Sequence, residues 1–149
     1  MGELLAYLLA LALMPALAWS LGRHGAWGVL RWGFPFLLCI GSVVLLAAAY
    51  WLVIPMYSRP RSWPGALAVA VYSATPVLLA GVALVLPQLV LVTFIAAVHS
   101  LVLQYQGTQD VLGVKRGDAA EVVAVAGVLL IAASMACGAV LARLNVLPI

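Results

Sequence analysis

The sequence predicts an all-α polytopic membrane protein, with five transmembrane helices in a compact bundle around a central helical hairpin. Hydrophobic residues make up 67% of the chain, and charged residues only 7%. The mean hydropathy of +1.23 lies far outside the range of soluble domains. A second observation is a run of 48 residues between Arg61 and Asp110 without Asp, Glu, Lys or Arg. One membrane helix needs about 20 apolar residues, so this run is long enough for two.

The long uncharged run divides at Pro87, which gives predicted spans at 65–86 and 88–105. Proline has no backbone N–H and disfavours helix in the residue before it, so a turn is expected there. The two spans are therefore predicted to form an antiparallel hairpin within the bilayer.

Two further spans are predicted before the hairpin. The first occupies 4–21, within the 19 uncharged residues between Glu3 and Arg23. A secretory signal has basic residues before its apolar core. Here the leading charge is acidic, which favours an uncleaved span. The second occupies 34–54, within the 27 uncharged residues between Arg31 and Arg59.

The last span is predicted at 120–144, after the polar segment that follows the hairpin. The third helix, which contains the span predicted at 65–86, can be capped at its start by Ser62 or Trp63, and Pro64 is acceptable in its first turn. The five spans form one transmembrane domain over residues 1–149. All formal charges lie outside the uncharged cores of the spans (122–142 in the last span), and the five tryptophans lie near span ends, as in an aromatic belt.

The distribution of basic residues favours a cytoplasmic N-terminus by a small margin. In that orientation the cytoplasmic side carries Arg59, Arg61, Lys115 and Arg116, whereas the opposite side carries Arg23, Arg31 and Arg143.

Three segments resemble the Yip family, five-span membrane proteins named for binding Ypt/Rab GTPases, and particularly its bacterial branch. They are the YSATP segment Tyr72–Pro76, the HSLVLQYQG segment His99–Gly107 and the VLGVKRGDA segment Val111–Ala119. The resemblance covers the C-terminal half closely and the first two spans mainly by hydropathy. It implies a five-helix domain with a cytoplasmic N-terminus, in a bacterial inner membrane. None of the three segments is a catalytic signature.

The hairpin interior is predicted to hold a polar cluster of Tyr72, Thr75, Pro76 and His99. Pro76 frees the carbonyl of Tyr72, which then needs a donor in hydrocarbon. In a hairpin that turns at Pro87, two residues on opposite helices lie at the same depth when their numbers add up to about 174, because both helices rise about 1.5 Å per residue. This rule sets His99 level with Thr75. The bent helix is either a hinge or substrate site, or a static kink. His99 is either an interhelical hydrogen-bonding group, or a ligand or proton relay.

Two further groups are candidates for contacts with lipid or with other helices. Lys115 and Arg116 could contact lipid headgroups, or could be an ordinary basic flank with Asp118 capping the last helix. Ser134, Gly138 and Ala142 form a stripe of small residues that permits close helix packing. Cys39 and Cys137 both lie in apolar runs, and we expect them to be free thiols.

Function is predicted less specifically than fold. The chain carries no paired carboxylates, nucleophile–base set or metal-ligand cluster, so we predict a protein that is not an enzyme and needs no metal or cofactor. The first hypothesis is a scaffold, a membrane-organising factor or a small subunit of a membrane complex. The alternative is a small permease, channel or lipid-handling transporter with a polar groove around the third and fourth helices. Expected partners are membrane lipids and a second copy or another membrane protein, and not nucleic acid.

Overall fold

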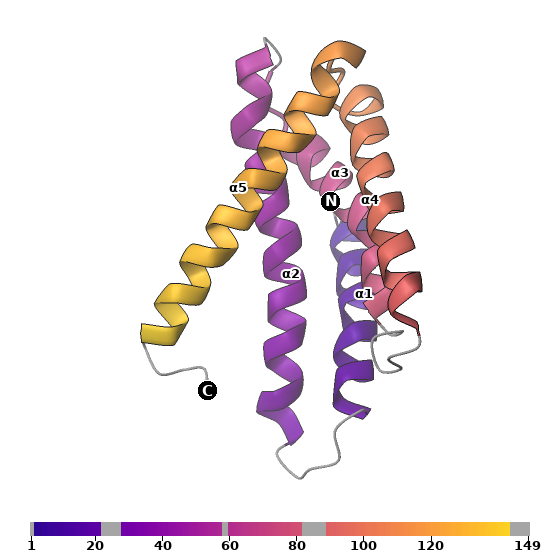
Figure 1. Ribbon diagram of the computed structural model, residues 1–149, viewed down its shortest axis with the longest axis vertical. Helices are drawn as coiled ribbons and strands as arrows, with labels where there is room; N and C mark the ends of the chain where they lie inside the picture. Colours follow the sequence, from indigo (N-terminus) through magenta and orange to yellow (C-terminus); the bar gives the residue numbers. More distant parts are fainter. Residues whose placement is uncertain (1, 22–27, 58–59, 82–88, 144–149) are drawn as a thin grey trace.

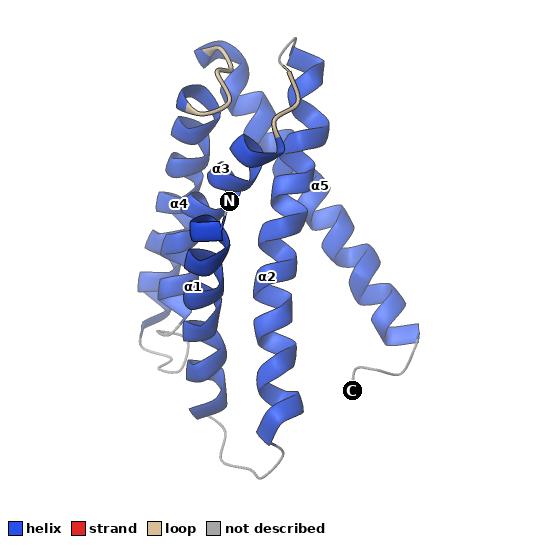
Figure 2. Cartoon of the chain, turned by 180° about the vertical axis from the view of Figure 1, so that it is seen from behind, coloured by secondary structure: helices blue, strands red, loops and turns tan. Residues whose placement is uncertain are grey.

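A computed structural model of the chain describes residues 2–21, 28–57, 60–81 and 89–143. These residues form five α-helices and one short 3-10 helix, with no strand among them (Figures 1 and 2). The helices are α1 (Gly2–Leu21), α2 (Gly28–Val53), α3 (Trp63–Ala80), α4 (Val90–Asp110) and α5 (Arg116–Arg143), with η1 (Ile54–Tyr57) after α2. The predicted all-α class and the five helices in order are confirmed.

Three helical segments are long and apolar enough to cross a membrane among the described residues. They are Phe36–Tyr57, Trp63–Ala80 and Arg116–Cys137, and Gly2–Met14 is a shorter apolar helix. The predicted turn at Pro87 and the end of the span at 86 lie outside the described residues. Three helices begin or end beyond the predicted spans by four residues or more: α2 begins at Gly28 and includes Arg31, α4 continues to Asp110, and α5 begins at Arg116. The polar residues at these ends extend each helix beyond its apolar core.

The N-terminus of α3 begins as the sequence predicts. Ser62 is the N-cap residue, and its hydroxyl accepts a hydrogen bond from the Gly65 backbone N–H at 3.2 Å. Pro64 lies in the first turn, where its missing N–H is not needed. Pro76 lies inside α3, which remains one helix through it.

Helices α3 and α4 pack closely near the α4–α5 turn. A Cβ on Gly107 would lie 3.2 Å from both methyl groups of Val69, and one on Gly65 would lie 3.2 Å from Leu112. Gly113 ends this turn in a left-handed conformation, with φ of 66°. Such a conformation favours glycine. The α2–α3 and α4–α5 connections therefore lie at the same end of the bundle (Figure 1).

The core lies between α2, α3 and this packed end. Its fully buried members include Tyr50, Val53, Ile54, Val71 and Val122. Helix α5 joins the core through its N-terminal half and diverges from α2 toward its C-terminal end (Figures 1 and 2). Its later apolar side chains are exposed, as at Val128 (65%) and Met135 (71%).

Candidate functional site

The polar groups nearest the middle of the α3–α4 pair are two serines. The Ser100 hydroxyl donates a hydrogen bond to the Ser73 backbone carbonyl at 2.6 Å, and both side chains are buried. Proline in a helix interior weakens the backbone hydrogen bonds of the preceding turn, and Ser73 lies in that turn of α3. The sequence predicts a donor from the facing helix for the Tyr72 carbonyl, which Pro76 frees. The hydrogen bond that crosses between the two helices instead reaches the Ser73 carbonyl, and its donor is Ser100, the residue after His99.

The Ser100 hydroxyl belongs to a chain of hydrogen bonds that joins three helices. The Gln104 side-chain N–H donates to the Ser100 hydroxyl at 3.5 Å, and the Tyr50 hydroxyl of α2 donates to the Gln104 side-chain oxygen at 2.9 Å. The Thr108 hydroxyl donates to the Gln104 backbone carbonyl at 2.7 Å. We call Tyr50, Ser73, Ser100, Gln104 and Thr108 the interior polar chain. All of its groups are neutral, so it can hold helices together without a buried charge.

Thr75 and Tyr72 meet a third residue, Tyr7 of α1. The Thr75 hydroxyl donates to the Val71 carbonyl at 3.1 Å, so the Tyr7 hydroxyl, 3.2 Å away, donates to Thr75. The rings of Tyr7 and Tyr72 pack with centroids 5.9 Å apart at an angle of 42°. These contacts join α1 to α3 on a partly exposed face, where Tyr72 is 57% exposed.

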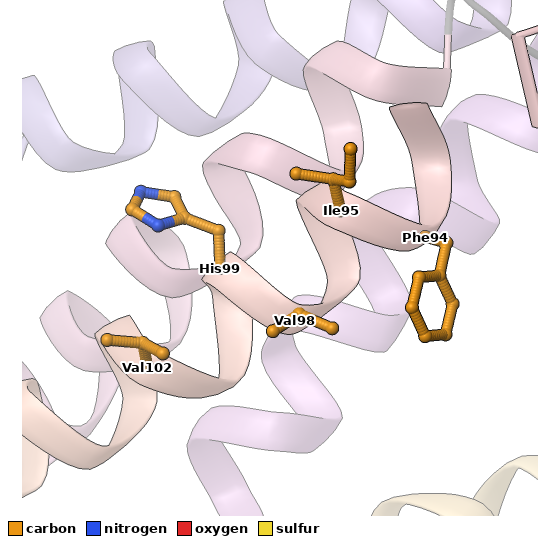
Figure 3. Close-up of a pocket in the computed structure, with 5 residues that line it drawn as sticks. All are labelled: Phe94, Ile95, Val98, His99 and Val102. Atoms are coloured by element: carbon orange, nitrogen blue, oxygen red, sulfur yellow. The ribbon is translucent and has the colours of Figure 1, made fainter. Parts of the chain in front are cut away.

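His99 does not lie in the hairpin interior, and this part of the prediction needs correction. Its imidazole is exposed on the outer side of α4, in a shallow hollow of about 400 Å³ lined by Phe94, Ile95, Val98, His99 and Val102 (Figure 3). Successive residues in a helix point about 100° apart. Because Ser100 faces α3, His99 is turned out of the interface. Its predicted depth fits the structure, since the contacts Ser73–Ser100 and Val69–Gly107 join residues whose numbers add up to about 174.

The signal that was missed is the spacing of Ser100, Gln104 and Thr108. They recur every four residues and therefore share one face of α4. The one histidine of α4, His99, lies on the neighbouring face of this helix. Tyr7 and Tyr50 carry no local signal, because their partners lie more than fifty residues away.

The predicted lipid-contact residues lie at the end of the bundle that holds the two connections. Lys115 and Arg116 are exposed, and the Arg116 carbonyl accepts a hydrogen bond from the Tyr105 hydroxyl at 3.3 Å. The Arg61 guanidinium lies 4.6 Å from the centre of the Trp51 ring, within the range of a cation–π contact.

In the predicted small-residue stripe, Ser134 is exposed and donates to the Leu130 carbonyl at 2.7 Å. Gly138 and Ala142 lie in α5, but their packing falls outside the described side chains. Cys39 and Cys137 are free, as expected. The described residues contain no group of three or more His, Cys, Asp or Glu side chains that could hold a metal ion.

Residues 2–138 match the family model of the Yip1 domain. The chain belongs to the Yip1 domain family. This assignment confirms the resemblance seen in the sequence, and with the apolar helices it establishes a membrane protein of Yip type. Yip1 is not known as an enzyme family. No curated protein and no solved structure matches the chain. The bacterial branch stays a prediction.

Proposed function

We propose that the chain is a non-catalytic membrane protein that acts as a scaffold, a membrane-organising factor or a small subunit of a membrane complex. The observation that supports this proposal is the division of its surfaces. The interior polar chain is hydrogen-bonded within the bundle, whereas long apolar faces of α4 and of the C-terminal half of α5 are left uncovered. Such faces suit contact with lipid or with other membrane helices.

The chemistry of the spans supports a non-enzymatic role. From Ser62 to Gln109 there is no Asp, Glu, Lys or Arg, so α3 and α4 offer no carboxylate or ammonium group for acid–base catalysis or ion coupling. The polar atoms of the interior chain are committed to one another and to backbone carbonyls. They serve as connections between helices.

A lipid-handling permease is the alternative function, and the hollow that contains His99 favours it. This hollow places one polar side chain on the outer surface of α4, where a lipid could lie. A permease that moves lipid headgroups needs a polar path along the whole helix. The other lining residues, Phe94, Ile95, Val98 and Val102, are apolar.

A lipid-scrambling assay separates the two functions. The purified protein is reconstituted into vesicles that contain a fluorescent phospholipid, and an impermeant reductant is added outside. A scaffold is expected to leave the inner-leaflet lipid protected, as in protein-free vesicles. Bleaching of both leaflets would contradict the scaffold proposal and support the permease. A His99→Leu variant then tests whether the hollow is the path.

We also propose that the N-terminus and the end of the bundle with the two connections face the cytoplasm. The close approach of Gly65 and Leu112 supports placing both connections on one side. In single-cysteine variants, Ser62→Cys and Gly117→Cys are expected to react with an impermeant thiol reagent from the cytoplasmic side, and Gln88→Cys from the other. Labelling of Gln88→Cys from the same side as the other two would contradict this topology.

The same end supports the proposal that Lys115 and Arg116 contact anionic lipid headgroups. Both side chains are exposed beside the start of α5. Each basic residue near an anionic membrane surface contributes about 1 kcal/mol of attraction, which salt weakens. We therefore expect that phosphatidylglycerol, an anionic lipid, raises the melting temperature of the double variant Lys115→Gln, Arg116→Gln less than that of the unmodified protein. Phosphatidylcholine, which has no net charge, should affect the two proteins equally.

A further inference from the structure

The outer face of α4 has the shape of a helix-docking groove. Its hollow lies between two rows of side chains spaced four residues apart: one row is Phe94, Val98 and Val102, and the other is Ile95 and His99 (Figure 3). Rows of this spacing are the ridges that pack into grooves when two helices meet. The chain leaves this face open, with Phe94 66% and Ile95 59% exposed.

His99 gives this face a polar group that an apolar lipid tail does not satisfy. The imidazole lies near the middle of α4, one residue from the buried contact between Ser100 and Ser73. In the proposed topology α4 crosses the membrane, so this position lies deep in the bilayer. A polar side chain exposed to hydrocarbon there is costly unless it finds a hydrogen-bonding partner. A neutral imidazole carries one donor and one acceptor nitrogen. The partner must therefore bring a hydrogen-bonding group to the middle of the bilayer.

We propose that the groove is the docking surface for α4 of a second copy of this chain. In a two-fold symmetric dimer the same patch meets itself, so His99 of each copy lies near the symmetry axis at equal depth. One imidazole then donates to the other, and so gives His99 a partner that it does not find among the described residues of a single copy. The apolar rows on either side pack as ridges into grooves. Imidazole, being both donor and acceptor, is complementary to itself, whereas a carboxylate or an ammonium group is not.

A second copy bound through α4 is a specific partner, which the proposed function does not name. A dimer through α4 is compatible with a scaffold and with a lipid permease, so the scrambling assay and the dimer test can fail separately. A lipid or a helix of a different protein in the groove is an outcome that would overturn the inference.

Disulfide trapping in vesicles tests the proposed surface. The background variant carries Cys39→Ala and Cys137→Ala, so that only one introduced thiol is present. Val98→Cys, in the groove, is expected to give a covalent dimer on mild oxidation. Val128→Cys on α5 is the matched control, because Val128 is likewise an exposed apolar residue (65%) but lies away from α4. Equal yields from both positions, or no dimer from Val98→Cys, would overturn the proposal.

The role of His99 is tested in the Val98→Cys background at low protein-to-lipid ratio. Because an interhelical hydrogen bond in a membrane changes association by about 3- to 10-fold, His99→Leu is expected to lower the dimer yield by that factor. His99→Gln keeps both a donor and an acceptor and is expected to retain most of the yield. An unchanged yield with His99→Leu would overturn docking through the imidazole. Unchanged thermal stability in the variants shows that the monomer fold is intact.

Discussion

The two faces of α4 carry similar polar side chains with opposite consequences. On the inner face, Ser100 and Gln104 are held by hydrogen bonds to α3 and α2. On the outer face, the His99 imidazole is exposed among apolar residues. The comparison shows that the contribution of a polar group to the stability of a helix bundle depends on the helix face that the group occupies. Ser100 and His99 are adjacent residues whose side chains point about 100° apart around the helix. Ser100 therefore holds the bundle together, whereas His99 is available to a partner.

The strongest way to break the inner face is to overpack its closest helix contact. Gly107→Leu is expected to destabilise the protein by about 1–3 kcal/mol, because its side chain collides with Val69. Adding Val69→Ala should recover part of the loss. Gly127→Leu is the control, since nothing lies within 4 Å of a Cβ placed there. Reversible unfolding in bicelles measures all four proteins. Equal losses at Gly107 and Gly127 would show that α3 and α4 do not pack as described.

A sharper test removes one link of the interior polar chain. Tyr50→Phe leaves the Gln104 side-chain oxygen without its donor, at an expected cost of about 1 kcal/mol. Gln104→Leu removes the acceptor. The double variant should cost less than the sum of the two single variants, because the two side chains are directly bonded. Additive losses in the same unfolding assay would rule out that bond.

The smallest effect is expected on the partly exposed face between α1 and α3. Tyr7→Phe removes the hydrogen bond to Thr75 but keeps the ring contact with Tyr72, so a loss of about 0.5 kcal/mol is expected. Tyr7→Ala removes both contacts and should cost more. If the two variants lose the same stability, the ring contact contributes nothing.

The helices and their order follow from the sequence because charge-free runs of span length have few other structures open to them in a membrane. The Ser62 cap of α3 and the relative depth of α3 and α4 follow from local signals and helix rise.

The rotation of each helix about its axis does not follow in the same way. A residue's depth depends on its position in the chain, but its direction depends on contacts with distant segments. Hydropathy separates inner from outer faces poorly when both are apolar, as around His99. The roles of Tyr7 and Tyr50 could not be predicted for the same reason, because their hydrogen-bond partners lie on other helices, far away in the sequence.

The most direct test of the account compares two adjacent residues in one assay. Ser100→Ala and His99→Ala are unfolded in bicelles at a dilution where the protein is monomeric. The account predicts a loss of about 1 kcal/mol for Ser100→Ala, because the Ser73 carbonyl loses its donor. It predicts nearly no change for His99→Ala, whose imidazole is exposed in the monomer. A larger loss for His99→Ala than for Ser100→Ala would contradict the assignment of the two faces of α4.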